Sequence, residues 1–146
     1  MFEAHHDGYT LSDDPNRLDL SIIHGFLATS YWATGISRAS VERAIRHSMP
    51  FGIYHDDGSG QVGFARVISD RATYGYLADV FVLEALRGRG LGRWMVSEIL
   101  RHPELQGLRR WGLVTRDAQP VYAAAGFTPL AAPERHMELV ARKPTR

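Results

Sequence analysis

The pattern of apolar and polar positions predicts a chain in which helices and strands alternate. Apolar residues recur at helical spacing through residues 18–32, 37–49, 91–102 and 117–125. Segments rich in β-branched, aromatic and other apolar residues, bounded by turn-forming residues, predict strands at 8–11, 51–54, 62–68, 74–83, 110–115, 127–130 and 135–140. Asp19 and Asp117 stand where they would cap the helices that follow them.

The order of these elements predicts an α/β fold with one mixed sheet of about six or seven strands and about four helices. No repeat, linker or low-complexity tract divides the chain, so residues 1–146 are expected to form a single domain. The fourth and fifth strands, 74–83 and 110–115, are joined through a helix and should therefore run parallel.

Charge and composition disfavour nucleic-acid-binding and membrane-spanning proteins. Seventeen basic and sixteen acidic side chains leave a net charge of +1, which disfavours a general nucleic-acid binder. No apolar run approaches the length of a membrane span, and the N-terminus is not a signal peptide. With no cysteine in the chain, a cytoplasmic location is the simplest expectation.

Metal binding is not expected either. The chain has no cysteine, and its seven histidines show no spacing typical of metal ligands. His5 and His6 are simplest to interpret as part of an N-terminal tail.

The segment that says most about function is a glycine-rich loop between a predicted strand and a predicted helix. It reads Arg87-Gly88-Arg89-Gly90-Leu91-Gly92. Glycines at alternate positions let the backbone turn tightly and approach a ligand closely. The helix N-terminus behind them attracts anions, so the loop is suited to a pyrophosphate, and its arginines add to the attraction.

Two common phosphate-binding motifs do not fit this loop. A dinucleotide-binding fingerprint requires a glycine where Arg93 stands, and a P-loop requires a lysine that the loop lacks. A flexible, solvated glycine loop without a ligand is the simpler alternative.

The loop resembles the pyrophosphate loop of the GNAT superfamily of acetyl-CoA-dependent N-acetyltransferases. The resemblance rests on Arg87-x-x-Gly90-x-Gly92, on Val82 five positions earlier, and on Tyr122-x-x-x-Gly126-Phe127 further along the chain. One position departs from the pattern: many relatives have Asn seven residues before the tyrosine, and this chain has Thr115.

The resemblance implies a GNAT-like fold whose sheet splays open between the fourth and fifth strands, with acetyl-CoA as co-substrate. It places the pyrophosphate on residues 87–92 and the thioester carbonyl near the backbone of Phe81 and Val82. It implies direct attack by a primary amine of a small molecule or a peptide. Tyr122 would protonate the departing thiolate, although a tyrosine here could instead be a core residue.

The group that takes the amine proton is left open between three candidates. Asp79 is the only acidic residue on the fourth predicted strand, and it is either the base or a hydrogen-bonded carboxylate that holds a loop. Tyr76 lies where many relatives place a base, and a water chain is the third candidate. Asp79 and Tyr76 would face opposite sides of an unbulged strand.

Two further alternatives accompany this interpretation. The chain could be an inactive module that binds CoA as a sensor, but a retained Tyr122 argues for catalysis. Many members of the superfamily dimerise, so a homodimer is an open expectation. Tyr31 and Trp32 are candidates for the acceptor pocket or for the core.

Overall fold

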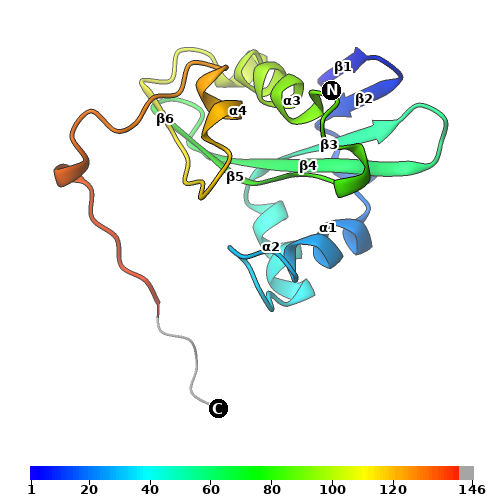
Figure 1. The fold of residues 1–146 in the computed structure, drawn as a ribbon, viewed down its shortest axis with the longest axis horizontal. Coiled ribbons are helices and arrows are strands. Elements are labelled where there is room, and N and C mark those ends of the chain that lie inside the picture. The colour runs from blue at the N-terminus through cyan, green and yellow to red at the C-terminus, as the bar shows by residue number, and fades with distance from the viewer. Residues whose placement is uncertain (142–146) are drawn as a thin grey trace.

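The computed structural model describes residues 1–141 as a six-stranded sheet with helices on both faces (Figure 1). The strands are β1 (Glu3–His6), β2 (Tyr9–Ser12), β3 (Met49–His55), β4 (Gly60–Ser69), β5 (Tyr74–Val82) and β6 (Arg110–Gly112). The helices are α1 (Leu20–Leu27), α2 (Arg38–Arg46), α3 (Leu91–Leu100) and α4 (Gln119–Ala123). Within this range, no helix has the length and apolar character needed to cross a membrane.

The sheet follows the chain order β1-β2-β3-β4-β5-β6, with every pair antiparallel except β5 and β6. The predicted parallel pair joined through a helix is therefore confirmed. Helices α3 and α4 cover one face, while α1 and α2 cover the other (Figure 1). Alternating residues of the strands supply both cores: Phe64 packs with α1 and α2, whereas Ala65 and Val67 belong to the core under α3.

The chain begins with a hairpin of β1 and β2, where only the second strand is predicted from the sequence. Residues 3–6 form β1 rather than a tail, so His5 and His6 lie in the sheet. The turn Asp7-Gly8 has positive φ at both residues, 47° and 86°. An Asp-Gly pair between short strands is a strong hairpin signal, and it could have identified β1 from the sequence.

Helix α1 ends earlier than its apolar pattern predicts. Asp19 is its N-cap, as expected, and its carboxylate accepts a hydrogen bond from the Ile22 amide at 3.1 Å. After Leu27, the Ser30 hydroxyl donates to the Leu27 carbonyl and accepts from the Ala33 amide, and these bonds turn the chain away from the helix. Tyr31 and Trp32 consequently lie in the α1–α2 loop, residues 28–37.

Helix α4 and the C-terminal segment also differ from prediction. Asp117 is not the cap of α4: the N-cap residue is Ala118, and its amide donates to the Thr115 hydroxyl at 3.0 Å. The strands predicted at 127–130 and 135–140 do not form. Residues 133–135 make a single 3-10 turn instead, and the chain then runs away from the sheet (Figure 1). Alternating apolar residues form a strand only where a neighbouring strand pairs with them.

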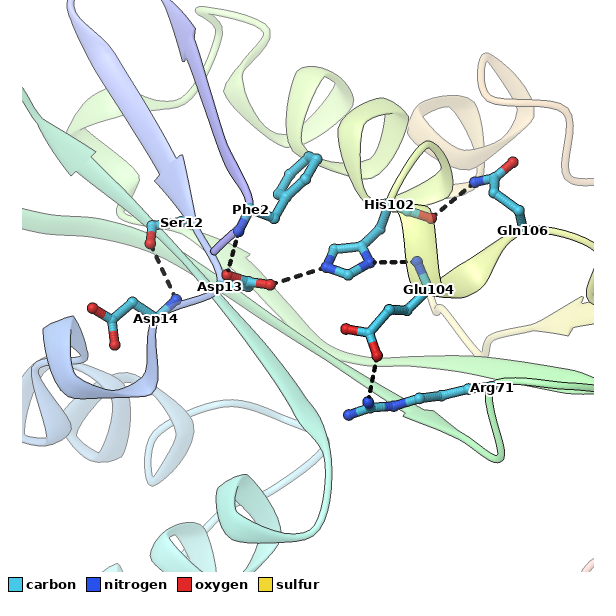
Figure 2. A network of polar contacts seen from close by, with 8 residues as sticks. All are labelled: Phe2, Ser12, Asp13, Asp14, Arg71, His102, Glu104 and Gln106. Carbon is cyan, nitrogen blue, oxygen red and sulfur yellow. Dashed lines mark hydrogen bonds and ion pairs between the residues drawn. The ribbon is translucent and has the colours of Figure 1, made fainter.

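A buried histidine joins the N-terminus to the end of α3 (Figure 2). His102 is 2% exposed, and its Nδ1 accepts a hydrogen bond from the Glu104 amide at 3.1 Å. The proton is therefore on Nε2, which donates to Asp13 at 2.9 Å. The second Asp13 oxygen accepts from the Phe2 amide at 2.9 Å. One carboxylate thus holds the first residues of the chain, the end of β2 and the C-terminal end of α3 together.

Replacing Asp13 should destabilise the fold measurably. Asp13→Ala leaves the buried Nε2–H of His102 without an acceptor, and this costs about 1–3 kcal/mol of unfolding free energy. Urea unfolding measures the difference. Glu3→Ala, on the exposed face of the same hairpin, is the matched control and should change stability by less than about 0.5 kcal/mol. Equal effects of the two changes would contradict the role assigned to Asp13.

Candidate functional site

The sheet opens between β5 and β6. The two strands pair only at Tyr74–Arg110, Gly75–Trp111 and Tyr76–Gly112, whereas β5 continues to Val82. Beyond Tyr76, the side of β5 that faces β6 has no strand partner within the described residues. Backbone groups at such an opening are free to bind a ligand, and ligands of α/β sheets bind at the carboxyl ends of parallel strands.

A β-bulge lies in β5 beside this opening. The β4–β5 register passes from Arg66–Ala78 to Phe64–Phe81, so Asp79 and Val80 stand opposite the single residue Ala65. Asp79 has a φ of 54°, in the left-handed region that non-glycine residues seldom adopt. The bulge breaks the strict alternation assumed from the sequence, in which Tyr76 and Asp79 face opposite sides.

The Asp79 carboxylate is paired through both oxygens. It accepts a hydrogen bond from Arg66 Nε at 2.6 Å and another from Trp32 Nε1 at 2.9 Å. The side chain is only 11% exposed, and that of Arg66 is 17% exposed. Asp79 therefore anchors the α1–α2 loop, through Trp32, to the bulge of β5.

Tyr76 lies in the same electrostatic environment as this ion pair. Partial burial is the main cause that raises the pKa of Tyr76 above its ordinary value, with Arg66 and Asp79 acting in opposite directions. A phenol with a raised pKa stays protonated at neutral pH. This makes Tyr76 a poor candidate for the base that removes a proton from the acceptor.

The α1–α2 loop also reaches the loop that follows β6. The Arg116 amide donates to the Tyr31 hydroxyl at 3.0 Å, and the Arg116 guanidinium lies 3.8 Å from the centre of the Tyr31 ring. Tyr31 and Trp32 pack edge to face with their ring centres 5.1 Å apart. One loop therefore contacts both the bulge of β5, through Trp32, and the loop after β6, through Tyr31.

The glycine-rich loop enters α3 in the conformation that its sequence suggests. Gly88 and Gly90 have φ of 84° and 76°, and Gly90 is the N-cap of α3 with no side chain bonded to the first amides. Leu91 is buried in the core and fixes the start of the helix. The helix therefore presents uncapped amides to any anion placed there.

Three arginines lie in the glycine-rich loop and in the first turn of α3. The side chains of Arg87, Arg89 and Arg93 are exposed, and within residues 1–141 none of them forms a salt bridge. Arg87 Nε donates to the Val82 carbonyl at 3.3 Å, which ties the loop back to the end of β5. A Cβ built on Gly92 would meet only Val82, at 3.9 Å.

Phe81 and Val82 form the end of β5 next to this loop. Phe81 is buried and stacks on Phe26 of α1 with ring centres 4.0 Å apart. Val82 is half-buried and packs against the core under α3. Their backbone therefore belongs to a rigid part of the sheet, held by packing on both faces.

Tyr122 lies on α4 and belongs to the core under α3. Its side chain is largely buried beside Phe127, with ring centres 6.0 Å apart. Burial, with a smaller contribution from Tyr31, raises the pKa of Tyr122 to about 12. The hydroxyl is therefore protonated throughout the physiological pH range and can act only as a donor of that proton.

The structure places three of the predicted features along β5 and the turn that follows it. The glycine loop is tied to Val82 at the end of β5, and Asp79 lies at the bulge, whereas Tyr122 lies on α4. Arg66 and Arg116 are not predicted from the sequence, because nothing in the linear pattern pairs Arg66 with Asp79 or Arg116 with Tyr31. Among residues 1–141, no group of three or more histidine or acidic side chains is placed to hold a metal ion.

Comparison with known proteins agrees with this geometry. Residues 47–129 match the model of the acetyltransferase (GNAT) domain. A protein of Gibberella zeae named as an acetyltransferase is 33% identical over 135 residues, which cover 78% of this chain and 75% of that protein.

Solved structures show the same fold. A GNAT-family protein of Xanthomonas campestris is 46% identical, with a TM-score of 0.88 over 94% of this chain and 96% of its own. An acetyltransferase of Clostridium acetobutylicum solved with acetyl-CoA shares the fold at 17% identity, with a TM-score of 0.64 over 90% of this chain and 94% of its own. The chain belongs to the GNAT family of acetyltransferases.

Proposed function

We propose that the chain transfers the acetyl group of acetyl-CoA to a primary amine of a small molecule or a peptide. The observation that carries the proposal is the uncapped N-terminus of α3, entered through Gly88 and Gly90 at positive φ, beside the opening between β5 and β6. The pyrophosphate of acetyl-CoA would bind the amides of residues 87–92. The pantetheine arm and thioester would then extend into the opening.

The reaction is a direct displacement. The amine nitrogen attacks the thioester carbonyl carbon, the new C–N bond forms, and the C–S bond breaks as CoA leaves. Backbone N–H groups near Phe81 and Val82 would stabilise the developing negative charge on the carbonyl oxygen. Tyr122, which is protonated at neutral pH, would give its proton to the departing sulfur.

The amine must also lose a proton. An alkyl amine with a pKa of about 10.4 is mostly protonated at pH 7, which costs about 4.6 kcal/mol if the free base must form. Asp79 is bonded to the α1–α2 loop through Trp32, and each of its oxygens retains a lone pair beyond the bonds from Trp32 and Arg66. Asp79 would bind the acceptor amine. It would then either take the amine proton itself or orient the amine so that water takes the proton.

A thiol-release assay with a panel of amines tests the proposal. Acetyl-CoA turnover that depends on one class of primary amine supports it. CoA binding without turnover on any amine, measured by calorimetry, would identify a non-catalytic CoA-binding module instead.

Gly92→Asp should weaken CoA binding by at least about tenfold, because it places a negative charge beside the phosphates. Gly92 is not at positive φ and its Cβ position is free, so the fold should tolerate the change. An acidic residue in the first turn of a helix is itself favourable. Calorimetry with CoA measures the affinity, and Gly92→Ala controls for bulk. Unchanged affinity in a folded Gly92→Asp variant would remove the loop from the cofactor site.

Two substitutions distinguish whether Asp79 acts as the base or only holds the α1–α2 loop in place. Asp79→Asn keeps the shape and tolerates the left-handed backbone, but it removes the charge. Trp32→Phe keeps the charge and removes one hydrogen bond to Asp79. If Asp79 is the base, only Asp79→Asn should abolish the acid limb of the pH–rate profile, with CoA affinity nearly unchanged. If both variants lower the rate equally and leave the profile intact, Asp79 is a positioning residue.

Tyr122→Phe should lower the single-turnover rate by about 10²–10⁴, the usual loss when a general acid is removed. The ring remains, so stability and the KM for acetyl-CoA should change little. Tyr9→Phe, another buried tyrosine far along the sheet, is the matched control. A wild-type rate in folded Tyr122→Phe would exclude this hydroxyl from the mechanism.

A further inference from the structure

We propose that the acceptor is a free α-amino acid with an apolar side chain, whose carboxylate binds Arg66 while its amino group binds Asp79. The inference rests on the acetyl transfer proposed above and names the substrate class of that reaction. It is carried by the hydrogen-bond donors that Arg66 leaves unused, by the spacing of the Arg66–Asp79 pair, and by the apolar side chains around the pair.

Arg66 has donors left over after its bond to Asp79. Its Nε donates to Asp79 at 2.6 Å, and within residues 1–141 its guanidinium forms no other hydrogen bond. Across that range, the only buried polar side-chain atom without a partner, among residues that are not exposed, is the Tyr54 hydroxyl. The terminal amino groups of Arg66 therefore contact solvent, although the side chain as a whole is only 17% exposed. They present a planar fork of N–H donors, a geometry that suits a carboxylate.

The charges and spacing of this pair favour a ligand that carries both an ammonium and a carboxylate. Asp79 by itself would attract any ammonium group, but the Arg66 guanidinium bonded to it repels a ligand that has positive charge alone. In an α-amino acid, the nitrogen lies about 2.5 Å from the carboxylate carbon. Arg66 Nε and the Asp79 oxygen are 2.6 Å apart, so one amino acid can reach both residues at once.

The same arrangement disfavours a peptide acceptor. In a peptide, the carbonyl next to the N-terminal amine belongs to a neutral amide, so the free amino groups of Arg66 would meet no anion. A lysine side chain carries its amine at the end of a long alkyl stem, away from any carboxylate of its own. Of the acceptor classes named above, a small molecule therefore fits the Arg66–Asp79 pair better than a peptide does.

Large apolar side chains surround the pair. Ile68 lies two residues after Arg66 on β4, so it shares a face of the sheet with Arg66, and it is 44% exposed. Its partner on β5 is the half-buried Tyr76. Trp32, which is bonded to Asp79, is 42% exposed. Sites for small molecules are lined mostly by apolar side chains, with a few polar groups that fix the orientation of the ligand. The side chain of the amino acid would therefore pack on this apolar surface.

Binding of matched ligands tests the carboxylate contact without any turnover. Calorimetry on the full chain saturated with CoA compares leucine with leucinamide at about pH 6, where both amino groups are protonated. Leucine should bind at least about tenfold more tightly, because only leucine offers a carboxylate to Arg66. Equal affinities, tighter binding of leucinamide, or no binding of either ligand would overturn the proposal.

Arg66→Lys tests whether Arg66 is the residue responsible. Lysine keeps a positive charge for Asp79 but has no planar fork, so the preference for leucine over leucinamide should fall about tenfold. Arg71→Lys is the matched control and should keep the preference, because Arg71 is also paired with a carboxylate, that of Glu104, but is 50% exposed. Arg66→Gln, which can still donate to Asp79, is the second variant if lysine destabilises the fold. A retained preference in a folded Arg66 variant, or an equal loss of both ligands, would overturn the role assigned to Arg66.

Acetyl-CoA turnover separates this inference from the proposed function. The comparison is between leucine and isoamylamine, which is leucine without its carboxylate. A kcat/KM at least about tenfold higher for leucine supports both proposals. Equal turnover of the two amines would overturn the amino-acid inference and leave acetyl transfer standing. Leucine that binds through Arg66 but is never acetylated would overturn the proposed function, while the carboxylate contact of Arg66 would stand.

Discussion

The unequal pairing of β5 is the constraint on which the site depends. On one side β5 is bonded to β4 from Ser69–Gly75 to Gly63–Val82, while on the other it is bonded to β6 for three residues only. The strand is therefore held rigidly in the sheet and yet presents a free edge over its second half. A ligand can approach backbone N–H groups there without any strand being displaced, and this is what electrostatic catalysis at a carbonyl requires.

The bulge at Asp79 links that free edge of β5 to the α1–α2 loop. It places a carboxylate at positive φ where Arg66 and Trp32 can both reach it, and Trp32 brings the α1–α2 loop with it. The neighbouring Tyr31 contacts Arg116 on the far side of the opening. A strained residue fixed by two partners is typical of functional sites, and here it lies where the α1–α2 loop contacts β5 through Trp32.

The edge of the sheet carries a second, separate constraint. An exposed edge strand can pair with another chain, and the three-residue length of β6 limits the number of backbone groups available for such pairing. In this chain the sequence after α4 has the apolar alternation to cover β6, but the proline-containing connector leads it outward. These residues therefore leave a groove beside β6, lined in part by Trp111 and Phe127, and leave Met137 and Leu139 exposed to solvent.

The sequence alone determined the features that depend on local chemistry. The glycine spacing of 87–92 requires positive φ before a helix, the Asp19 cap follows from the first turn of α1, and the helix between β5 and β6 makes them parallel. The family motifs around Arg87, Tyr122 and Gly126 carried the cofactor hypothesis. The glycine turn and the Asp19 cap are confirmed because each involves residues only a few positions apart.

Only the tertiary structure decided what depends on residues distant in the chain. The bulge arises from a two-against-one register between β4 and β5, and the partners of Asp79 come from positions 32 and 66. Residues 135–140 show the same limit, since their alternation suits a strand, but a strand exists only when another strand supplies its hydrogen bonds.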